Sequence, residues 1–271
     1  MKISIHKSIT VSILTLCTLG SYVHPAKAVL LGYYTFDNGT ANDVSGNGNN
    51  GVLSSPTAPQ FTSASAWQGQ SASFNGSSWI TVPININPST SPQITMGGWF
   101  RATDASYISA VISHDNGPFD RTIGIDNRIG PSPNGPYRWS TFIGTGVLPG
   151  STVELNTWNF VSLRHNQATG ELILDVNQNR YKQTGVTFTA GDSNTRIGDN
   201  PNFDTPFRGL GDNVFIYNEV LSDAQIAAIQ SQGGVNAAVP FEFSPSIGLV
   251  SLAGIWFASN VLKRRRFKAE T

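Results

Sequence analysis

Cysteine is almost absent from this 271-residue chain, in which Cys17 is the only one. A single cysteine cannot form an intramolecular disulfide, so the fold must be held together by packing and, where a metal binds, by its ligands. Charged residues are also few, at 13% of the sequence, and acids and bases balance at 17 each. The chain is nevertheless long enough to bury one large hydrophobic core or two small ones.

The N-terminus, residues 1–28, has the features of a secretory signal peptide. Two lysines give a positive start, residues 9–19 are apolar, and Ala26-Lys27-Ala28 is a small-x-small cleavage motif. The alternative is a buried N-terminal helix. The signal interpretation predicts that the mature domain is exported and has no cysteine.

The C-terminus contains an apolar run without charge, residues 246–262, followed by four basic residues at 263–266. As a helix this run is about 25 Å long, slightly short of a ~30 Å hydrocarbon core. We predict that residues 246–271 form a separate transmembrane-type helix with a basic cytoplasmic tail, preceded by a linker at 236–245. The alternative is a buried core helix.

The region between the two ends has nine basic and fifteen acidic residues, a net charge of about −6. Nucleic acid is therefore not expected as a partner, because phosphate binding requires a basic face.

Short apolar runs broken by Gly, Asn, Asp, Pro and Ser fill most of this central region. Asn75-Gly76 between two such runs predicts a β-hairpin. Residues 157–165 and 171–176 alternate in polarity and are joined by turn residues, which predicts a second strand pair. Many short strands indicate an all-β sandwich or barrel.

One short helix is predicted near the end of this region. Ser222 and Gln225 have the spacing of a capping box, and Gly233 can end the helix.

Five segments follow one another in an order that resembles the concanavalin A-like lectin/glucanase superfamily, in its laminin G-like (LamG) form. They are residues 33–51 (YYTFDNGTANDVSGNGNNG), 72–82 (ASFNGSSWITV), 94–102 (ITMGGWFRA), 155–177 and 207–226. The resemblance covers about residues 31–232, in a domain that we predict at 29–235. It implies a two-sheet antiparallel jelly-roll β-sandwich with one short C-terminal helix.

Two positions depart from the family pattern. Asn177-Gln178 stands where the family often has Asn-Gly in a hairpin turn. Asn213 stands where the family often has glutamate after Asp212, and this removes a carboxylate.

The C-terminal segment resembles the PEP-CTERM group of sorting signals, with Pro240-Phe241-Glu242 in place of the usual Pro-Glu-Pro. The resemblance implies handling by an exosortase-type membrane enzyme, that is, a sorting protease or transpeptidase. If the tail is not cleaved, its helix remains a membrane anchor. Both alternatives place the domain in the cell envelope, at the cell surface or outside the cell.

The stretch from Asp43 to Gly48 resembles the start of an EF-hand calcium loop. The twelfth position of such a loop would be Ser54, which cannot supply the bidentate acid that the loop requires. We therefore interpret Asp43 as an Asx-turn residue.

The family resemblance implies a different, structural calcium site. Its ligands would be Asp37, Asp212 and the backbone at the Gly76 turn, because Ca²⁺ takes hard oxygen ligands. The alternative is that both aspartates cap strands or accept hydrogen bonds in turns.

Catalysis is not expected. The glutamates of the domain, Glu154, Glu171 and Glu219, are solitary in sequence, whereas a retaining glycosidase needs two carboxyl groups about 5–5.5 Å apart.

Ligand binding is predicted in the segment from His114 to Trp139, which is rich in aromatic, amide and charged side chains. Sugars are bound by aromatic faces together with hydrogen-bonding groups. The alternative is a Gly/Pro-rich loop with Trp139 in the core. The predicted rim residues are Asp115, Asn116, Arg121, Arg128, Tyr137 and Trp139.

The sequence therefore predicts an exported, non-catalytic module that binds an extracellular or envelope glycan. The alternatives are a structural or adhesive protein that binds other proteins, and a glycoside hydrolase.

Overall fold

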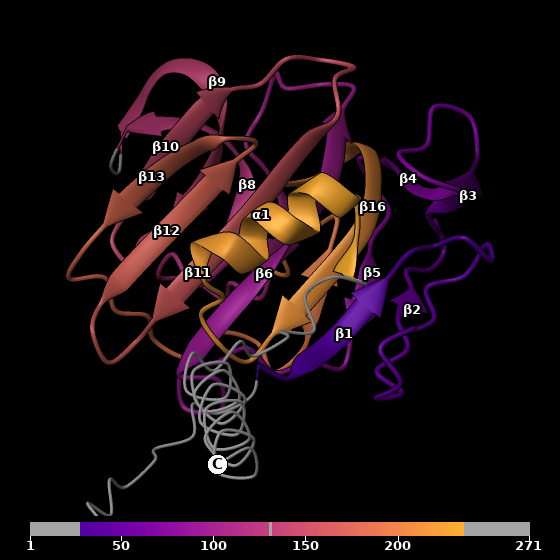
Figure 1. Ribbon diagram of the computed structural model, residues 1–271. Coiled ribbons are helices and arrows are strands. Elements are labelled where there is room, and N and C mark those ends of the chain that lie inside the picture. Colours follow the sequence, from indigo (N-terminus) through magenta and orange to yellow (C-terminus); the bar gives the residue numbers. More distant parts are fainter. Residues whose placement is uncertain (1–27, 130–131, 236–271) are drawn as a thin grey trace, which may run out of the picture.

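The computed structural model describes residues 28–129 and 132–235, which form two β-sheets packed face to face with one helix outside (Figure 1). The predicted signal peptide up to residue 27, the linker and the apolar C-terminal helix lie outside these residues. Within them, no helix is long and apolar enough to cross a membrane.

Sheet A contains β1, β3, β4, β6, β11, β12, β13 and β16. Along the sheet the order is β13 (Asn179–Gln183), β12 (Glu171–Val176), β11 (Asn159–Asn166), β6 (Gln93–Ala102), β16 (Arg208–Tyr217), β4 (Ser71–Asn75) and β3 (Gln60–Thr62), and β1 (Leu30–Tyr34) pairs with β16 beside β4. All of these pairs are antiparallel.

Sheet B contains the remaining strands. Its order is β10 (Val147–Thr152), β9 (Ser132–Phe142), β8 (Thr122–Ile129), β7 (Ser109–Ser113), β14 (Thr195–Ile197), β5 (Ile80–Val82) and β2 (Val52–Leu53). The two-residue strand β15 (Thr205–Pro206) pairs with β7 and is the one parallel element in the described part of the chain. The predicted two-sheet, essentially antiparallel sandwich is thus confirmed.

The main core lies between the two sheets and is built from the alternating apolar residues of the strands. On β11, Val161 and Leu163 belong to this core, whereas Phe160 on the same strand belongs to a second cluster on the outer face of sheet A. This is the period of two expected of strands. The predicted pairing of β11 with β12 is confirmed, with Leu163 opposite Leu174.

The outer face of sheet A is covered by helix α1 (Asp223–Gln232), which lies across β6, β11 and β16 in Figure 1. Ile226 and Ile229 pack on Trp99, Phe160 and other outer-face aromatics to form the second cluster. Both faces of β6 are therefore buried, which fits the apolar and glycine residues on both faces of the strand.

Capping fixes both ends of α1 as predicted. The Ser222 hydroxyl accepts from the Gln225 backbone N–H at 3.3 Å, and Gln225 Oε1 accepts from the Ser222 backbone N–H at 2.8 Å. Gly233 ends the helix in the left-handed region, with φ of 70°.

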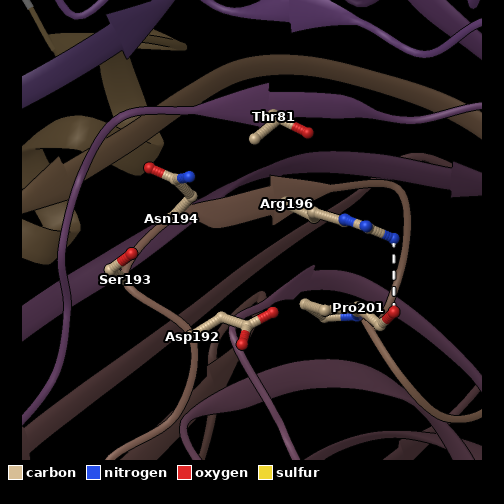
Figure 2. Close-up of a pocket in the computed structure, with 6 residues that line it drawn as sticks. All are labelled: Thr81, Asp192, Ser193, Asn194, Arg196 and Pro201. Carbon is tan, nitrogen blue, oxygen red and sulfur yellow. Dashed lines mark hydrogen bonds between the residues drawn. The ribbon is translucent and has the colours of Figure 1, made fainter.

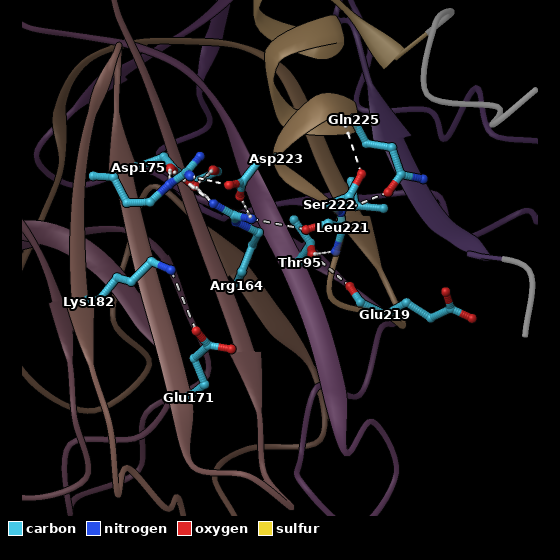
Figure 3. A network of polar contacts seen from close by, with 12 residues as sticks. Thr95, Arg164, Glu171, Asp175, Lys182, Glu219, Leu221, Ser222, Asp223 and Gln225 are labelled. Atoms are coloured by element: carbon cyan, nitrogen blue, oxygen red, sulfur yellow. Dashed lines mark hydrogen bonds and ion pairs between the residues drawn. The ribbon is translucent and has the colours of Figure 1, made fainter. Parts of the chain in front are cut away.

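An ion-pair network joins the first turn of α1 to sheet A (Figure 3). Arg164 contacts Asp175 at 2.9 Å and Asp223 at 2.7 Å. Arg180 contacts the same two aspartates, at 2.8 and 2.5 Å. The helix is thus held to β11, β12 and β13 by charge as well as by its apolar face.

The hairpin predicted at Asn75-Gly76 is wrong. The strands on either side of it lie in different sheets, because β4 pairs with β3 and β16 in sheet A whereas β5 pairs with β2 and β14 in sheet B. Gly76, at φ of 81°, turns the chain out of one sheet and toward the other. Asn75 and Gly76 do form a turn, but it connects a strand of sheet A to a strand of sheet B.

The turn between β12 and β13 contains Asn177 and Gln178. Asn177 takes the left-handed conformation, with φ of 54°. Its side chain also accepts from the Phe160 N–H at 2.9 Å and donates to Asn159 Oδ1 at 2.8 Å. The first departure from the family pattern therefore leaves the hairpin intact.

Candidate functional site

Asp43 has no free carboxylate oxygen for a metal. Its Oδ1 accepts from the backbone N–H groups of Tyr33 and Ser45, and its Oδ2 accepts from the Ser45 hydroxyl and the Asn49 N–H. The residue closes an Asx turn, as predicted.

Asp212 on β16 is different, because one of its oxygens is buried without a partner. The side chain is 0% exposed, and its Oδ2 accepts from Gln68 N at 3.1 Å and from Ser71 Oγ at 2.8 Å. Its Oδ1 has no hydrogen-bond partner among the described residues. Burial, and to a smaller extent the negative charge of Asp37, raises the pKa of Asp212 to about 6.

Asp37 and Asp212 are linked by the turn that precedes β4. Asp37 Oδ1 accepts from Gln70 N at 3.0 Å, two residues beyond the N–H that Asp212 binds. The Gln70 Oε1 oxygen is also buried with no partner in the described chain. Two carboxylates thus bind the backbone of residues 68–70, where Gln70 also has an unused amide oxygen.

This donor set fits a calcium ion. Buried oxygens normally have a partner, and Ca²⁺ takes carboxylate and amide oxygens at 2.3–2.6 Å. Asp37, Asp212 and Gln70 are the side chains that would hold it. Across residues 28–129 and 132–235, no three His, Cys, Asp or Glu side chains are grouped to hold a metal by themselves, so such an ion would need amide or carbonyl ligands as well.

Gly76 does not belong to this set, which corrects the third predicted ligand. It follows Asn75, which pairs with Arg208, whereas Asp212 follows Gly211, which pairs with Ala72. Gly76 is therefore level with Phe207 and about 17 Å from the level of Asp212 along the strands, at ~3.4 Å per residue. The turn near Asp212 is the one at the start of β4, not the one at its end.

Asn213, the second departure from the family pattern, has a structural role. Its Oδ1 accepts from the Tyr33 hydroxyl at 2.7 Å, and its Nδ2 donates to the Gly233 carbonyl at 2.6 Å. The amide therefore joins β1 and the end of α1 to β16. A glutamate could accept from Tyr33 but could not donate to Gly233.

Three of the six predicted rim residues are buried, and two of them, Trp139 and Arg121, are fully enclosed. Trp139 is 0% exposed and packs in the core beside Phe100, because the register of β9 turns it inward together with Ile125 of β8. Arg121 is also 0% exposed and donates to the Ile86 and Ser91 carbonyls at 2.6 Å. Neither side chain lines a rim.

The other four do not converge on one pocket. Asp115 is 2% exposed and accepts from Asn200 Nδ2 at 3.0 Å, which joins two loops. Arg128 binds Asp126 through Nε and Nη2, the latter at 2.5 Å, and Tyr137 is partly buried against the core. Asn116 is exposed.

A polar pocket of about 290 Å³ opens instead on the outer face of sheet B, at β5 and β14 (Figure 2). Thr81 and Arg196 are opposite each other on these strands, and their side chains point away from the core because Ile80 and Ile197 point into it. The lining residues are Thr81, Asp192, Ser193, Asn194, Arg196 and Pro201.

Arg196 forms one wall of the pocket. Its guanidinium lies 4.6 Å from the centroid of the Trp79 ring and pairs with the Asp199 carboxylate. Nη1 also donates to the Pro201 carbonyl at 3.5 Å, the contact drawn in Figure 2. The side chain is thereby fixed in place.

Asp192 forms the opposite wall. Its backbone N–H donates to the His114 carbonyl at 2.7 Å, and its carbonyl lies 3.1 Å from His114 Nδ1. In Figure 2 its carboxylate points toward the space beside Arg196. No ion pair or hydrogen bond engages this carboxylate within the described residues, so the pocket presents a free acceptor on a backbone that His114 holds in place.

The pocket residues were missed in the sequence. They come from three segments, at 81, 192–196 and 201, and each segment reads as an ordinary polar strand or turn. Only the pairing of β5 with β14 brings them together.

The sequence profile described as "Concanavalin A-like lectin/glucanases superfamily" matches residues 74–227, more than half of the chain. A search of curated proteins found no match to this chain.

Several solved structures share the fold. Domain 4 of AbnA, a GH43 extracellular arabinanase from Geobacillus stearothermophilus, was solved in complex with arabinotriose. It is 19% identical with a TM-score of 0.58, and the match covers 74% of this chain and 97% of that domain. The binding domain of Paraclostridial Mosquitocidal Protein 1 is 16% identical with a TM-score of 0.56, over 75% of this chain and 52% of that one.

A botulinum neurotoxin type C structure, from a study of its dependence on two ganglioside molecules for cell entry, is 14% identical with a TM-score of 0.53. The match covers 76% of this chain and 51% of that one. The chain thus spans nearly all of the arabinanase domain and about half of each toxin chain. At these identities the likeness concerns the fold.

Proposed function

Because the chain belongs to the concanavalin A-like lectin/glucanases superfamily, we propose that it is a carbohydrate-binding module without catalytic activity, which holds a sugar unit in the pocket on the outer face of sheet B. The observation that carries this proposal is the pocket's lining of hydrogen-bonding groups, one of which, Arg196 on β14, is held in place by Asp199 and Trp79. Sugar recognition needs such groups, positioned in advance, to bind hydroxyls.

The related structures support a binding role. One is a domain solved with arabinotriose, one is the binding domain of a mosquitocidal protein, and one is a neurotoxin whose cell entry depends on two ganglioside molecules. These ligands belong to those proteins, and the glycan bound by this chain is to be found by experiment.

Calcium is proposed as a structural ion at Asp37, Asp212 and Gln70. When bound it would supply positive charge to two carboxylates, one of which is buried with an unpartnered oxygen. The chain's own residues would then tie β16 to the turn before β4, which already contacts Asp212 through Gln68 and Ser71.

Export and attachment are proposed from the sequence alone. The module would leave the cytoplasm through residues 1–28 and be sorted or anchored through residues 236–271. Its partners would be an envelope or extracellular glycan and the enzyme that processes the tail.

Two other functions compete with this one. An adhesive protein would bind other proteins instead of a glycan. A hydrolase is suggested by the arabinanase neighbour. The three glutamates of the domain, however, lie in different elements: Glu154 in a turn, Glu171 on β12 and Glu219 after β16. Glu171 also lies 3.7 Å from Lys182.

A glycan array with and without calcium tests the proposal. Thr81→Tyr should fill the pocket and reduce binding of any bound glycan at least tenfold, whereas Thr152→Tyr, on the exposed end of β10, should leave it unchanged. No binding to any glycan, or equal binding by both variants, would contradict the assignment. Protein capture that sugars do not compete would favour the adhesive alternative, and release of sugar by the wild-type protein would favour a hydrolase.

A further inference from the structure

The charges around the pocket do not balance. Arg196 is its only cationic lining residue, and that charge is already paired with Asp199. Asp192 faces the same space and has no cationic partner in the described chain. The pocket with its walls therefore carries one formal negative charge.

Two further carboxyl groups, those of Asp115 and Asp120, lie near Asp192. Asp120 is fully buried, and its pKa is raised by burial and also by the charges of Asp115 and Asp192, so the three carboxylates are close enough to interact. The nearest histidine offers no compensation, since burial lowers the pKa of His114 to about 4 and it is neutral at pH 7.

The adjacent arginines are committed elsewhere. Arg121 donates to carbonyls of the loop before β6, on the inner side of the sheet. Arg128 is bound to Asp126 and stacks on Phe119 and Phe142, at 5.2 and 5.5 Å. The field at the pocket thus favours a cation and opposes an anion.

The backbone of Asp192 is held in place. His114 binds it on both sides, through its carbonyl and its ring Nδ1, and Asn87 Nδ2 donates to its carbonyl at 3.4 Å. When the carboxylate forms a charge-assisted hydrogen bond, only the freedom of a short side chain is lost.

We propose that the pocket selects a sugar unit with a free ammonium group, as in an N-deacetylated hexosamine polymer, and that Asp192 is the residue that determines this specificity. The inference rests on the proposed glycan-binding function and narrows its substrate class. Acetylation of the amine removes the charge that Asp192 recognises, and a uronic acid is repelled by it.

Calorimetric titration of the full chain with four soluble oligosaccharides tests this inference. The probes are a glucosamine oligomer, its N-acetylated counterpart, a neutral glucose oligomer and a uronic acid oligomer, all at pH 6. The glucosamine oligomer should bind at least tenfold more tightly than the other three, and salt should weaken it because exposed charge pairs are screened.

Asp192→Asn should remove this preference, lowering affinity for the glucosamine oligomer about tenfold and leaving the acetylated oligomer unchanged. Glu154→Gln is the matched control. It removes one exposed carboxylate beside β9 and β10, at the opposite edge of sheet B from the pocket, and should bind like the wild type. The melting temperature of each variant verifies that it is folded.

Three results would overturn the inference. If the acetylated, neutral or uronic oligomer binds as tightly as the amine, glycan binding stands and the charge selection fails. If Asp192→Asn keeps the preference while Thr81→Tyr abolishes binding, the pocket is right and the residue is wrong. If no oligosaccharide binds at all, the proposed function fails together with this inference.

Discussion

Arg164 on β11 donates from Nη1 to Asp223 Oδ1 over 2.7 Å, and this contact crosses from sheet A to the first turn of helix α1. Arg164 is only 2% exposed and is bound on its other side by Asp175, which is also buried, whereas Asp223 is largely exposed. The two aspartates therefore hold the same guanidinium from environments of very different polarity.

Asp175→Ala should destabilise the domain far more than Asp223→Ala. Removing Asp175 leaves Arg164 buried without its main counterion, which costs roughly 3–5 kcal/mol. Removing the exposed Asp223 should cost less than about 1 kcal/mol, and the cost should shrink in high salt. Urea denaturation at low and high salt measures both. Equal losses would mean that Arg164 is not the buried centre of the network.

Asp212→Asn should stabilise the calcium-free domain at neutral pH. The folded pKa of about 6 is above the ordinary 3.8, so the protonated form is favoured and the stability it contributes is lost as pH rises from about 4 to about 6. Two pKa units correspond to about 3 kcal/mol. With a chelator present, the difference in unfolding free energy between Asp212→Asn and the wild type should grow as the pH rises from about 4 to about 6.

In the presence of calcium, the wild type should become more stable than Asp212→Asn. The wild type should gain thermal stability on addition of Ca²⁺, because the ion compensates the buried carboxylate, and the variant should gain little. The proposed calcium site would be contradicted if the two proteins had parallel profiles of stability against pH in chelator, or if calcium stabilised both equally.

His165→Gln should reduce the acid sensitivity of the domain. His165 accepts from Arg121 Nη2 at 3.0 Å and contacts the Val186 carbonyl at 3.2 Å, and burial together with Arg121 lowers its pKa to about 4. The neutral form of His165 therefore stabilises the folded domain above the ordinary pKa of 6.5. This stabilisation is lost as the pH falls toward 4, by about 3 kcal/mol in total.

Glutamine retains one acceptor and one donor at position 165, so the fold should survive. Tryptophan fluorescence during acid titration follows the change, with His114, lowered to a similar pKa, retaining its own contribution. An unchanged acid midpoint would show that His165 does not stay neutral in the folded domain.

Trp139→Ala should destabilise the domain by about 3–5 kcal/mol, the usual cost of deleting a large buried aromatic side chain. Trp139→Phe should cost less, and glycan binding by that folded variant should match the wild type. If Trp139→Phe lost glycan binding without losing stability, Trp139 would be part of the ligand site after all.

The elements with local signals were predictable from the sequence. The Ser222 capping box and the alternation in β11 and β12 depend on neighbours within a few residues, and the structure has them as expected. Asn75-Gly76 shows the limit. A turn signal states that the chain reverses or bends, but the partner of the next strand, β14, lies more than a hundred residues away.

The sites were harder to predict for the same reason. Composition drew attention to residues 114–139, yet the register of β8 and β9 decides that Trp139 faces inward and that Arg128 pairs with Asp126. Asp212 and Asp37 were identified through family resemblance, whereas the orphaned Gln70 oxygen became visible only with the packing of residues 68–70. The pocket at Asp192 has no local signature.

The two boundaries of the folded domain meet on one side of it. Val29 exchanges backbone and side-chain hydrogen bonds with Asn218 at the end of β16, and the Val235 N–H lies 3.4 Å from the Tyr33 hydroxyl on β1, both in sheet A. The pocket opens on the far side of the sandwich, beyond sheet B. A segment joined at either boundary would thus leave the domain on the side of sheet A, opposite the pocket, and the two junctions would lie close together.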